Sequence, residues 1–135
     1  RRVLFRSNRN TQCFLTQDWG QNEDWGVWST GPNPGLALFM PSGKPKTLTL
    51  DLRAFIQARH PTQQVNISLD GVAQKTVTLT KLDNNQIELN IPASAYGKEW
   101  LNLQFSLPQA ISPKALGMGE DNRQLGIGLK SAVFR

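Results

Sequence analysis

Short runs of alternating apolar and polar residues most constrain how this chain can fold. In residues 47–54, Leu48, Leu50 and Leu52 alternate with polar side chains. Because successive side chains of a β-strand point to opposite faces, this pattern predicts a strand with one buried and one solvated face. The pattern recurs around four more groups of apolar residues: Val65, Ile67 and Leu69; Val77 and Leu79; Ile87, Leu89 and Ile91; Leu101, Leu103, Phe105 and Leu107.

Turn signals separate these runs. Asp70-Gly71 predicts a tight hairpin, because glycine accepts the positive φ that such a turn requires. One short helical turn is predicted with Ser112 as its N-cap, Pro113 at its first position and Gly117 just past its end. With so little helix, the chain is predicted to be all-β: an antiparallel β-sandwich, jelly-roll-like, with one short helical turn.

The chain of 135 residues suits one domain. Residues 1–7 resemble the in-frame translation of a sequencing-adapter oligonucleotide, and we leave them out of the fold prediction. The alternative is a genuine basic N-terminal tail. We therefore expect a non-native or disordered segment at residues 1–11 and an accessory β-sandwich domain at residues 12–135, in a fragment recovered from metagenomic DNA.

Composition argues against several classes of partner. The chain has 15 Lys and Arg against 10 Asp and Glu, but without Arg1, Arg2 and Arg6 the balance is 12 against 10. Since no basic cluster remains, nucleic acid is not expected as a partner. The longest apolar stretch, residues 36–40, is too short for a membrane-spanning helix, so we expect no direct membrane insertion by this domain. Cys13 is the only cysteine and can form no internal disulfide.

No catalytic constellation stands out. His60 is the only histidine and lies in a predicted loop, where we expect a solvated side chain. A histidine-rich metal site is therefore excluded, and we predict no metal, no other cofactor and no catalytic residue. A small glycosidase stays open as an alternative, and it would need two carboxylates facing each other in one cleft.

A tryptophan-rich segment is the first candidate binding site. Trp19, Trp25 and Trp28 lie within ten residues and are interleaved with acidic and amide side chains, among them Asp24. Aromatic faces beside carboxylates and amides are typical of a sugar-binding cleft. The alternative is structural: Trp25 and Trp28 cover the mouth of the sandwich, where burial of each ring stabilises the fold.

A glycine-rich loop over residues 117–123 is the second candidate. The planar guanidinium of Arg123 suits phosphate or neighbouring sugar hydroxyls. The alternative is a local ion-pair network in which Arg123 with Glu120 and Asp121 pins the loop to the last strand. The tentative set of ligand-binding residues predicted from the sequence is Trp25, Trp28, Asp24, Arg123 and Glu120.

Four short motifs occur in order: Trp25-Gly26, Trp28-Ser29, Ser112-Pro113, and Arg123 followed by Leu-Gly-Ile-Gly at 125–128. Over residues 14–134 the chain resembles the C-terminal β-sandwich domain of phosphoglycerol transferase I-like bacterial envelope proteins. The resemblance implies a non-catalytic accessory domain, whose partners are the upstream catalytic domain of the same protein and, as a second candidate, a glycan. The expected parent is a membrane-anchored transferase that modifies periplasmic glucans, which places the domain at the periplasmic face of the inner membrane of a Gram-negative bacterium.

Similar domains also accompany glycosyltransferase-like envelope proteins, so the resemblance leaves the parent enzyme open. Two alternative functions stay open with it: a purely structural domain, and a carbohydrate-binding module of such a glycosyltransferase-like protein. In all of these cases we expect the tryptophan-bearing segment over residues 23–29 and the glycine-rich segment over residues 112–129 to meet in space.

Overall fold

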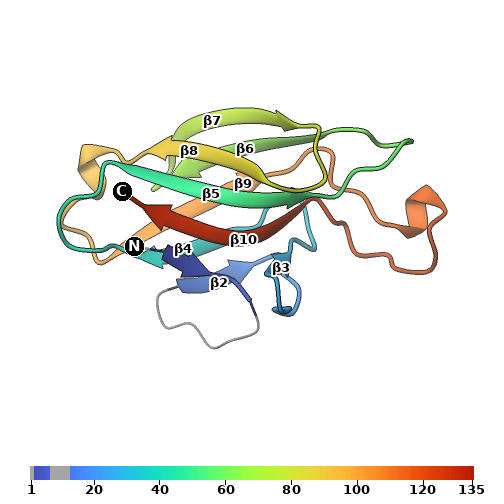
Figure 1. Ribbon diagram of the computed structural model, residues 1–135, viewed down its shortest axis with the longest axis horizontal. Helices are drawn as coiled ribbons and strands as arrows, with labels where there is room; N and C mark the ends of the chain where they lie inside the picture. The colour runs from blue at the N-terminus through green and yellow to red at the C-terminus, as the bar shows by residue number, and fades with distance from the viewer. Residues whose placement is uncertain (1, 7–12) are drawn as a thin grey trace.

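The computed structural model describes residues 2–6 and 13–135, which form two antiparallel sheets packed face to face (Figure 1). Sheet A has the order β1-β10-β5-β8, and β3 also pairs with β10. Its strands are β1 (Arg2–Leu4), β3 (Val27–Trp28), β5 (Thr47–Ala54), β8 (Asn85–Asn90) and β10 (Ile127–Phe134).

Sheet B has the order β2-β4-β9-β6-β7. Its strands are β2 (Cys13–Gln17), β4 (Gly35–Phe39), β6 (Gln63–Leu69), β7 (Val72–Leu79) and β9 (Trp100–Ser106). From β4 onward the chain changes sheet at every connection except the β6–β7 hairpin, as in a jelly roll. The predicted all-β, jelly-roll-like sandwich is confirmed.

The core lies between the two sheets. Leu48, Leu50 and Leu52 of β5 are completely buried, and Leu101 and Leu103 of β9 are completely buried on the opposite sheet. Each such side chain contributes roughly 1.5–3 kcal/mol by leaving water. The alternation seen in the sequence therefore places one face of every central strand in a shared apolar layer.

The local turn predictions are also confirmed. Asp70 and Gly71 have φ angles of 47° and 81° and join β6 to β7. The predicted helical turn is the short 3₁₀ helix η2 (Lys114–Leu116), which starts one residue later than expected, with Pro113 as its N-cap and Gly117 just past its end. Ser112 Oγ accepts a hydrogen bond from the Ala115 amide at 3.0 Å. The structure adds one 3₁₀ turn that the sequence did not indicate, η1 (Ala93–Ala95).

The first residues differ from the expectation. We left residues 1–7 out of the fold, but residues 2–4 form β1 of sheet A, which pairs with residues 131–133 of β10, and the Phe5 amide donates to the Lys130 carbonyl at 3.1 Å. The physical reason is that Val3 and Phe5 alternate inward, and both are only 1% exposed. Residues 1 and 7–12 lie outside the described residues. The adapter origin of this segment stays a prediction, because any chain with this alternation fits the strand edge.

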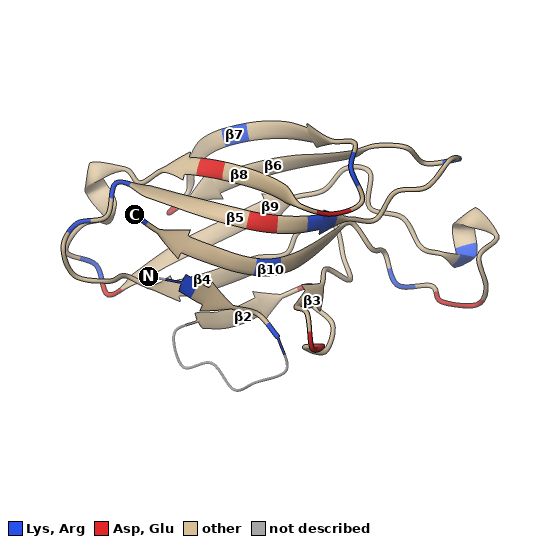
Figure 2. Cartoon of the chain, in the orientation of Figure 1, with Lys and Arg blue, Asp and Glu red and all other residues tan. Residues whose placement is uncertain are grey.

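Charged residues are unevenly divided between the sheets (Figure 2). Strands β2, β4, β6 and β9 of sheet B contain none, whereas sheet A carries Asp51 and Arg53 on β5, Glu88 on β8 and Lys130 on β10. Within the described part of the chain, no helical segment is long and apolar enough to cross a membrane.

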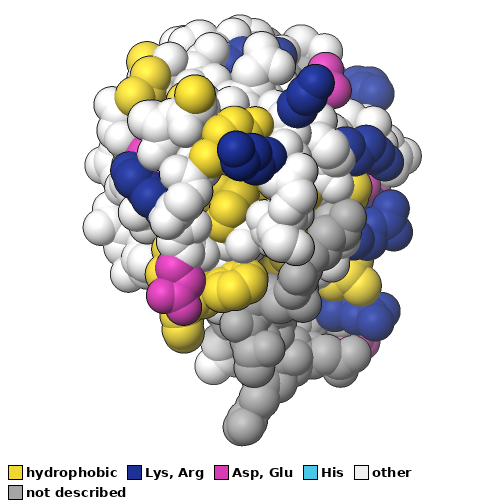
Figure 3. Space-filling model, turned by 90° about the vertical axis from the view of Figure 1, so that its left-hand side faces the viewer, with side chains coloured by type: hydrophobic (Ala, Val, Ile, Leu, Met, Phe, Trp, Pro, Cys, Tyr) yellow, Lys and Arg dark blue, Asp and Glu magenta, His cyan; other side chains and the backbone are white. Residues whose placement is uncertain are grey.

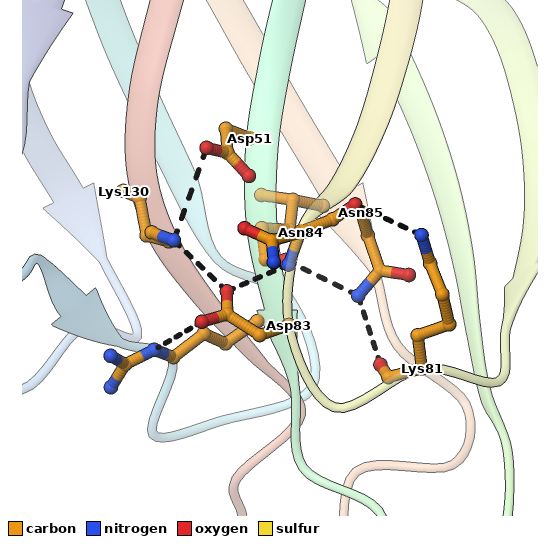
Figure 4. A network of polar contacts seen from close by, with 8 residues as sticks. Asp51, Lys81, Asp83, Asn84, Asn85 and Lys130 are labelled. Atoms are coloured by element: carbon orange, nitrogen blue, oxygen red, sulfur yellow. Dashed lines mark hydrogen bonds and ion pairs between the residues drawn. The ribbon is translucent and has the colours of Figure 1, made fainter.

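The connection from β7 to β8 is anchored by polar contacts (Figure 4). Lys130 Nζ lies 3.0 Å from Asp83 Oδ1 and 4.0 Å from Asp51 Oδ2, and Arg53 Nε lies 3.6 Å from Asp83 Oδ2. The buried Asn85 side chain donates to the Leu52 carbonyl at 3.2 Å. The charges of sheet A thus hold a crossing loop in place.

Candidate functional site

The tryptophan-bearing and glycine-rich segments meet, as expected. Trp28 pairs with Gly128, and the completely buried Ser29 accepts hydrogen bonds at Oγ from the Gly126 and Ile127 amides, at 3.1 and 2.9 Å. These contacts join residues almost one hundred positions apart. We call this arrangement of residues 25–29 against 126–129 the clasp.

Two glycines make the clasp possible. A Cβ on Gly26 would collide with the backbone carbonyl of Leu129, so only glycine lets the two strands approach this closely. A Cβ on Gly128 would lie 2.7 Å from the ring of Trp25. The residues that carry the family resemblance therefore fit together for packing.

The faces of the clasp tryptophans are engaged by the protein itself. Trp25 and Trp28 meet edge to face with ring centroids 5.2 Å apart, and Trp28 meets Phe55 in the same way at 6.3 Å. The guanidinium carbon of Arg53 lies 4.0 Å from the centroid of the Trp25 ring, a cation–π contact. This geometry supports the structural alternative for the two tryptophans.

Arg123 is likewise paired within the protein. Its Nη2 lies 2.7 Å from Asp121 Oδ2, and its Nε lies 3.0 Å from Asp121 Oδ1. These hydrogen bonds lower the pKa of the Asp121 carboxyl to about 2 and raise the pKa of Arg123. Glu120, in contrast, lies 3.8 Å from Lys114 and points into solvent, with 93% of its side chain exposed.

The sequence-predicted ligand set is thus only partly brought together. Trp25 and Trp28 touch, and Asp24 and Trp25 line a small hollow of about 240 Å³ together with Asp51 and Lys130. Arg123 and Glu120 have different ionic partners, so the structure does not join them to each other. As a ligand site this set stays a prediction.

His60 is not a freely solvated side chain. Its Nε2 lies 2.7 Å from the Gln109 carbonyl oxygen, and the amide of the completely buried Gln63 lies 3.3 Å from the same nitrogen. The expectation of a solvated histidine was wrong, because the 55–62 loop folds back on residues 107–110. The contacts give His60 a role in holding these two loops together.

A different surface has the chemistry of a binding site. On β6 and on β9 after Trp100, the outward-pointing side chains are uncharged amides and hydroxyls and the alternate positions are buried. The edge strand β7 adds two outward hydroxyls, Thr76 and Thr78, opposite Asn66 and Gln64. We call this surface the neutral face; it consists of Gln64, Asn66, Ser68, Thr76, Thr78, Asn102, Gln104 and Ser106.

The neutral face contains a groove of about 440 Å³, lined by Asn33, Asn66, Ser68, Thr76, Gln104 and Ser106. Thr76 Oγ1 donates to Asn66 Oδ1 at 2.8 Å, so the Asn66 amide keeps its N–H donors for another molecule. The side chains of Gln104 and Ser106 form no hydrogen bond to another described residue. Lys75, the one charged residue along the groove, donates instead to the Glu88 carbonyl at 2.7 Å.

An aromatic cluster lies at the other end of β9. Trp100 packs against Phe14 and Phe39, with ring centroids 5.0 and 5.5 Å apart. Phe14 is 59% exposed. The cluster lies where β4 ends and β9 begins, at the end of the sandwich that Figure 3 views, where apolar side chains lie among lysines and arginines.

The neutral face carries no motif that marks it in the sequence. The alternation of residues 63–69 and 100–106 predicted the strands, but their polar positions read as ordinary solvated side chains. The available signal was chemical: these positions hold only amides and hydroxyls, whereas the matching positions of residues 47–54 include Asp51 and Arg53.

One family model matches residues 15–133. Its description is "Domain of unknown function (DUF7024)". The chain belongs to this family. The match covers both halves of the clasp and all strands of sheet B except the first two residues of β2, so the clasp and the neutral face both lie within the shared domain. A search of curated proteins found no significant match.

Solved structures with a similar fold are carbohydrate-binding modules. The first module of family 36 from a multidomain xylanase of the Trinervitermes trinervoides hindgut metagenome has a TM-score of 0.54 and 12% identity, covering 100% of this chain and 97% of its own. A family 36 module in complex with calcium and xylotriose has a TM-score of 0.50 and 10% identity over 100% of this chain and 99% of its own. A family 35 module from Clostridium thermocellum has a TM-score of 0.51 and 8% identity over 98% and 97%.

At these identities the similarity establishes the sandwich fold and nothing further. Among residues 2–6 and 13–135, no three His, Cys, Asp or Glu side chains are grouped to hold a metal ion. Any ligand of this domain must therefore be inferred from its own surface.

Proposed function

We propose that this domain is a non-catalytic accessory module that binds a neutral glycan on the neutral face of sheet B. The observation that carries the proposal is the groove of about 440 Å³, in which amide and hydroxyl side chains of neighbouring strands lie beside Ala73 and Lys75. Sugar hydroxyls both donate and accept hydrogen bonds, and amide side chains offer both functions. The carbohydrate-binding modules with the same fold support the class of ligand.

The direct test is calorimetric titration with neutral oligosaccharides such as xylotriose and gluco-oligosaccharides. Gln104→Ala removes an exposed groove amide without disturbing the core, and we expect it to weaken binding about tenfold. Gln86→Ala is the matched control, because Gln86 is an exposed strand amide on the outer face of sheet A, opposite Asp51. Equal binding by both variants, with unchanged unfolding temperatures, would refute the proposed site.

The biological setting is a finer proposal that rests on the family resemblance. We infer that the domain belongs to a membrane-anchored, phosphoglycerol transferase-like enzyme of the Gram-negative envelope and holds periplasmic glucan near its upstream catalytic domain. Sequencing the intact gene tests this. A metal-dependent catalytic domain of the alkaline-phosphatase type behind membrane-spanning helices is expected, and a glycosyltransferase domain in its place would move the parent reaction to sugar transfer.

A purely structural role is the second candidate, and the clasp favours it. The residues of the resemblance motifs, among them Trp25, Gly26 and Ser29, pack against β10. In that case the unchanged domain would bind none of the oligosaccharides. Deleting the domain from the parent protein would lower only the stability of the catalytic domain.

A further inference from the structure

We propose that the aromatic cluster of Trp100, Phe14 and Phe39 is a second sugar-contacting position, so that the ligand is an extended neutral chain running along β9. This inference rests on the proposed function and names its substrate class: an oligosaccharide of several units, bound along its length rather than at its end.

The first step is that the groove and the cluster share one face. Trp100, Asn102, Gln104 and Ser106 alternate with buried residues along β9, so all four point outward on the same side of sheet B. Trp100 and Gln104 are four residues apart, which corresponds to about 13 Å along a strand. A single sugar ring is too short to reach from one position to the other.

The second step is that, between the cluster and the groove, β9 presents the exposed side chains of Asn102 and Gln104. Opposite Asn102 and Gln104, β4 presents only Ala37 and Gly35. Both are buried: the missing side chain of Gly35 leaves room for Gln104 Oε1 and Thr16 Oγ1, which would lie 2.7 and 2.9 Å from a Cβ there. The path between the groove and the cluster therefore runs over the outward side chains of β9 rather than over β4.

The third step is the chemistry of the cluster. Phe14 lies on β2, at the edge of sheet B, with 59% of its surface exposed, and its ring packs against the partly buried Trp100. Aromatic rings stack on the C–H faces of sugars. Because strands β2, β4, β6 and β9 carry no charged residue, an uncharged ligand with both C–H and hydroxyl surface is the best complement.

The test compares ligand lengths. Titrating the domain with a neutral disaccharide and the matching hexasaccharide, we expect Trp100→Ala to weaken hexasaccharide binding about three- to tenfold and leave disaccharide binding unchanged. Gln104→Ala should weaken binding of both ligands. Phe14→Ala is the second variant, since this exposed side chain can be removed with little effect on folding, and it should act in the same direction as Trp100→Ala.

The outcomes separate the two proposals. If the cluster variants bind both ligands as the unchanged domain does while Gln104→Ala still weakens binding, the second position is refuted and the glycan-binding function stands. Equal losses for both ligand lengths in Phe14→Ala would also refute the extended chain. If Phe14→Ala changes only the oligomeric state in light scattering, the cluster contacts protein. If neither sugar binds the unchanged domain, both proposals fail.

Discussion

The outer faces of the two sheets use their polar groups in opposite ways. On sheet A, Lys130 and Arg53 reach the same carboxylate of Asp83, and Arg53 also covers Trp25. On sheet B, the exposed side chains of Gln104 and Ser106 have no hydrogen-bond partner among the described residues. One face is occupied with its own contacts, and the other has donors and acceptors to offer.

This difference separates residues that maintain the fold from residues that are available to a ligand. The clasp of sheet A is distinctive in sequence because close packing restricts which residues fit there. A glycan face tolerates many arrangements of amides and hydroxyls, so its residues look unremarkable in one sequence. The motifs that stand out in the sequence therefore belong to the clasp, which maintains the fold, and not to the neutral face.

We expect the largest loss of stability from a substitution in the clasp. Gly26→Ala places a Cβ against the Leu129 carbonyl, and we expect a loss of about 3 kcal/mol in the free energy of unfolding, because the backbones must separate. Gly43→Ala is the matched control. Its φ is 89° but no atom lies within 4 Å of the new Cβ, so backbone strain alone should cost about 1 kcal/mol. Denaturant unfolding measures both, and equal losses would contradict the steric account.

The next largest effect concerns one buried hydroxyl. Ser29→Ala removes the acceptor for two buried amides, those of Gly126 and Ile127, and should cost about 2 kcal/mol of stability. Ser106→Ala on the neutral face is the control, with an expected change within about 0.5 kcal/mol. The glycan titration should show the reverse order, with weaker binding for Ser106→Ala only.

Much of the fold could be predicted because it depends on local rules. The alternation of residues 47–54 corresponds to β5, and Asp70-Gly71 corresponds to the hairpin between β6 and β7. The strand at residues 2–4 was not predicted, because residues 1–7 were left out of the fold prediction as a translated adapter. Its apolar positions follow the same rule as those of the other strands.

The candidate site was harder to predict, because it is assembled by pairing between distant strands. Asn66 lies opposite Ser106, and Ser68 lies opposite Gln104, but nothing local in the sequence states this register. The partners of charged residues were equally hidden: Arg53 on Trp25 joins β5 to the segment before β3. Tryptophans beside carboxylates looked like a sugar site, yet here a cation of the protein occupies the ring face.

A smaller loss of stability is expected at acid pH, and it tests the ionic contacts of Asp83 on sheet A. Burial raises the pKa of Asp83, but the hydrogen bonds from Lys130 and the Asn84 amide and the charges of Lys130 and Arg53 outweigh it, so the pKa is lowered overall. A lowered pKa in the folded state means that Asp83 stabilises the fold above its unfolded pKa of about 4 and loses this contribution as the pH falls through the folded value. Since the side chain is 39% exposed, solvent screening keeps the contribution below about 1 kcal/mol.

Asp83→Asn should therefore lower stability slightly at pH 7 and flatten the loss of stability below about pH 4. Urea unfolding over this pH range measures the change. Glu88→Gln, which removes an exposed carboxyl of the same sheet without touching the Asp83 contacts, serves as the control. A loss of stability at acid pH that Asp83→Asn leaves unchanged would show that the Lys130 contact adds nothing to folding.

The smallest effect that we expect is the salt dependence of glycan affinity, and it shows most directly which of the two faces binds the ligand. If the glycan binds the neutral face, its affinity should change less than about twofold when the salt concentration rises from low to physiological values, because no charge takes part. An acidic glycan held by Lys130, Arg53 or Arg123 would instead lose affinity steeply, as ionic contacts at exposed sites are screened. Calorimetry of one neutral and one anionic oligosaccharide at two salt concentrations tests this. Salt-sensitive binding of the anionic sugar alone would instead place the ligand beside these basic residues, away from the neutral face.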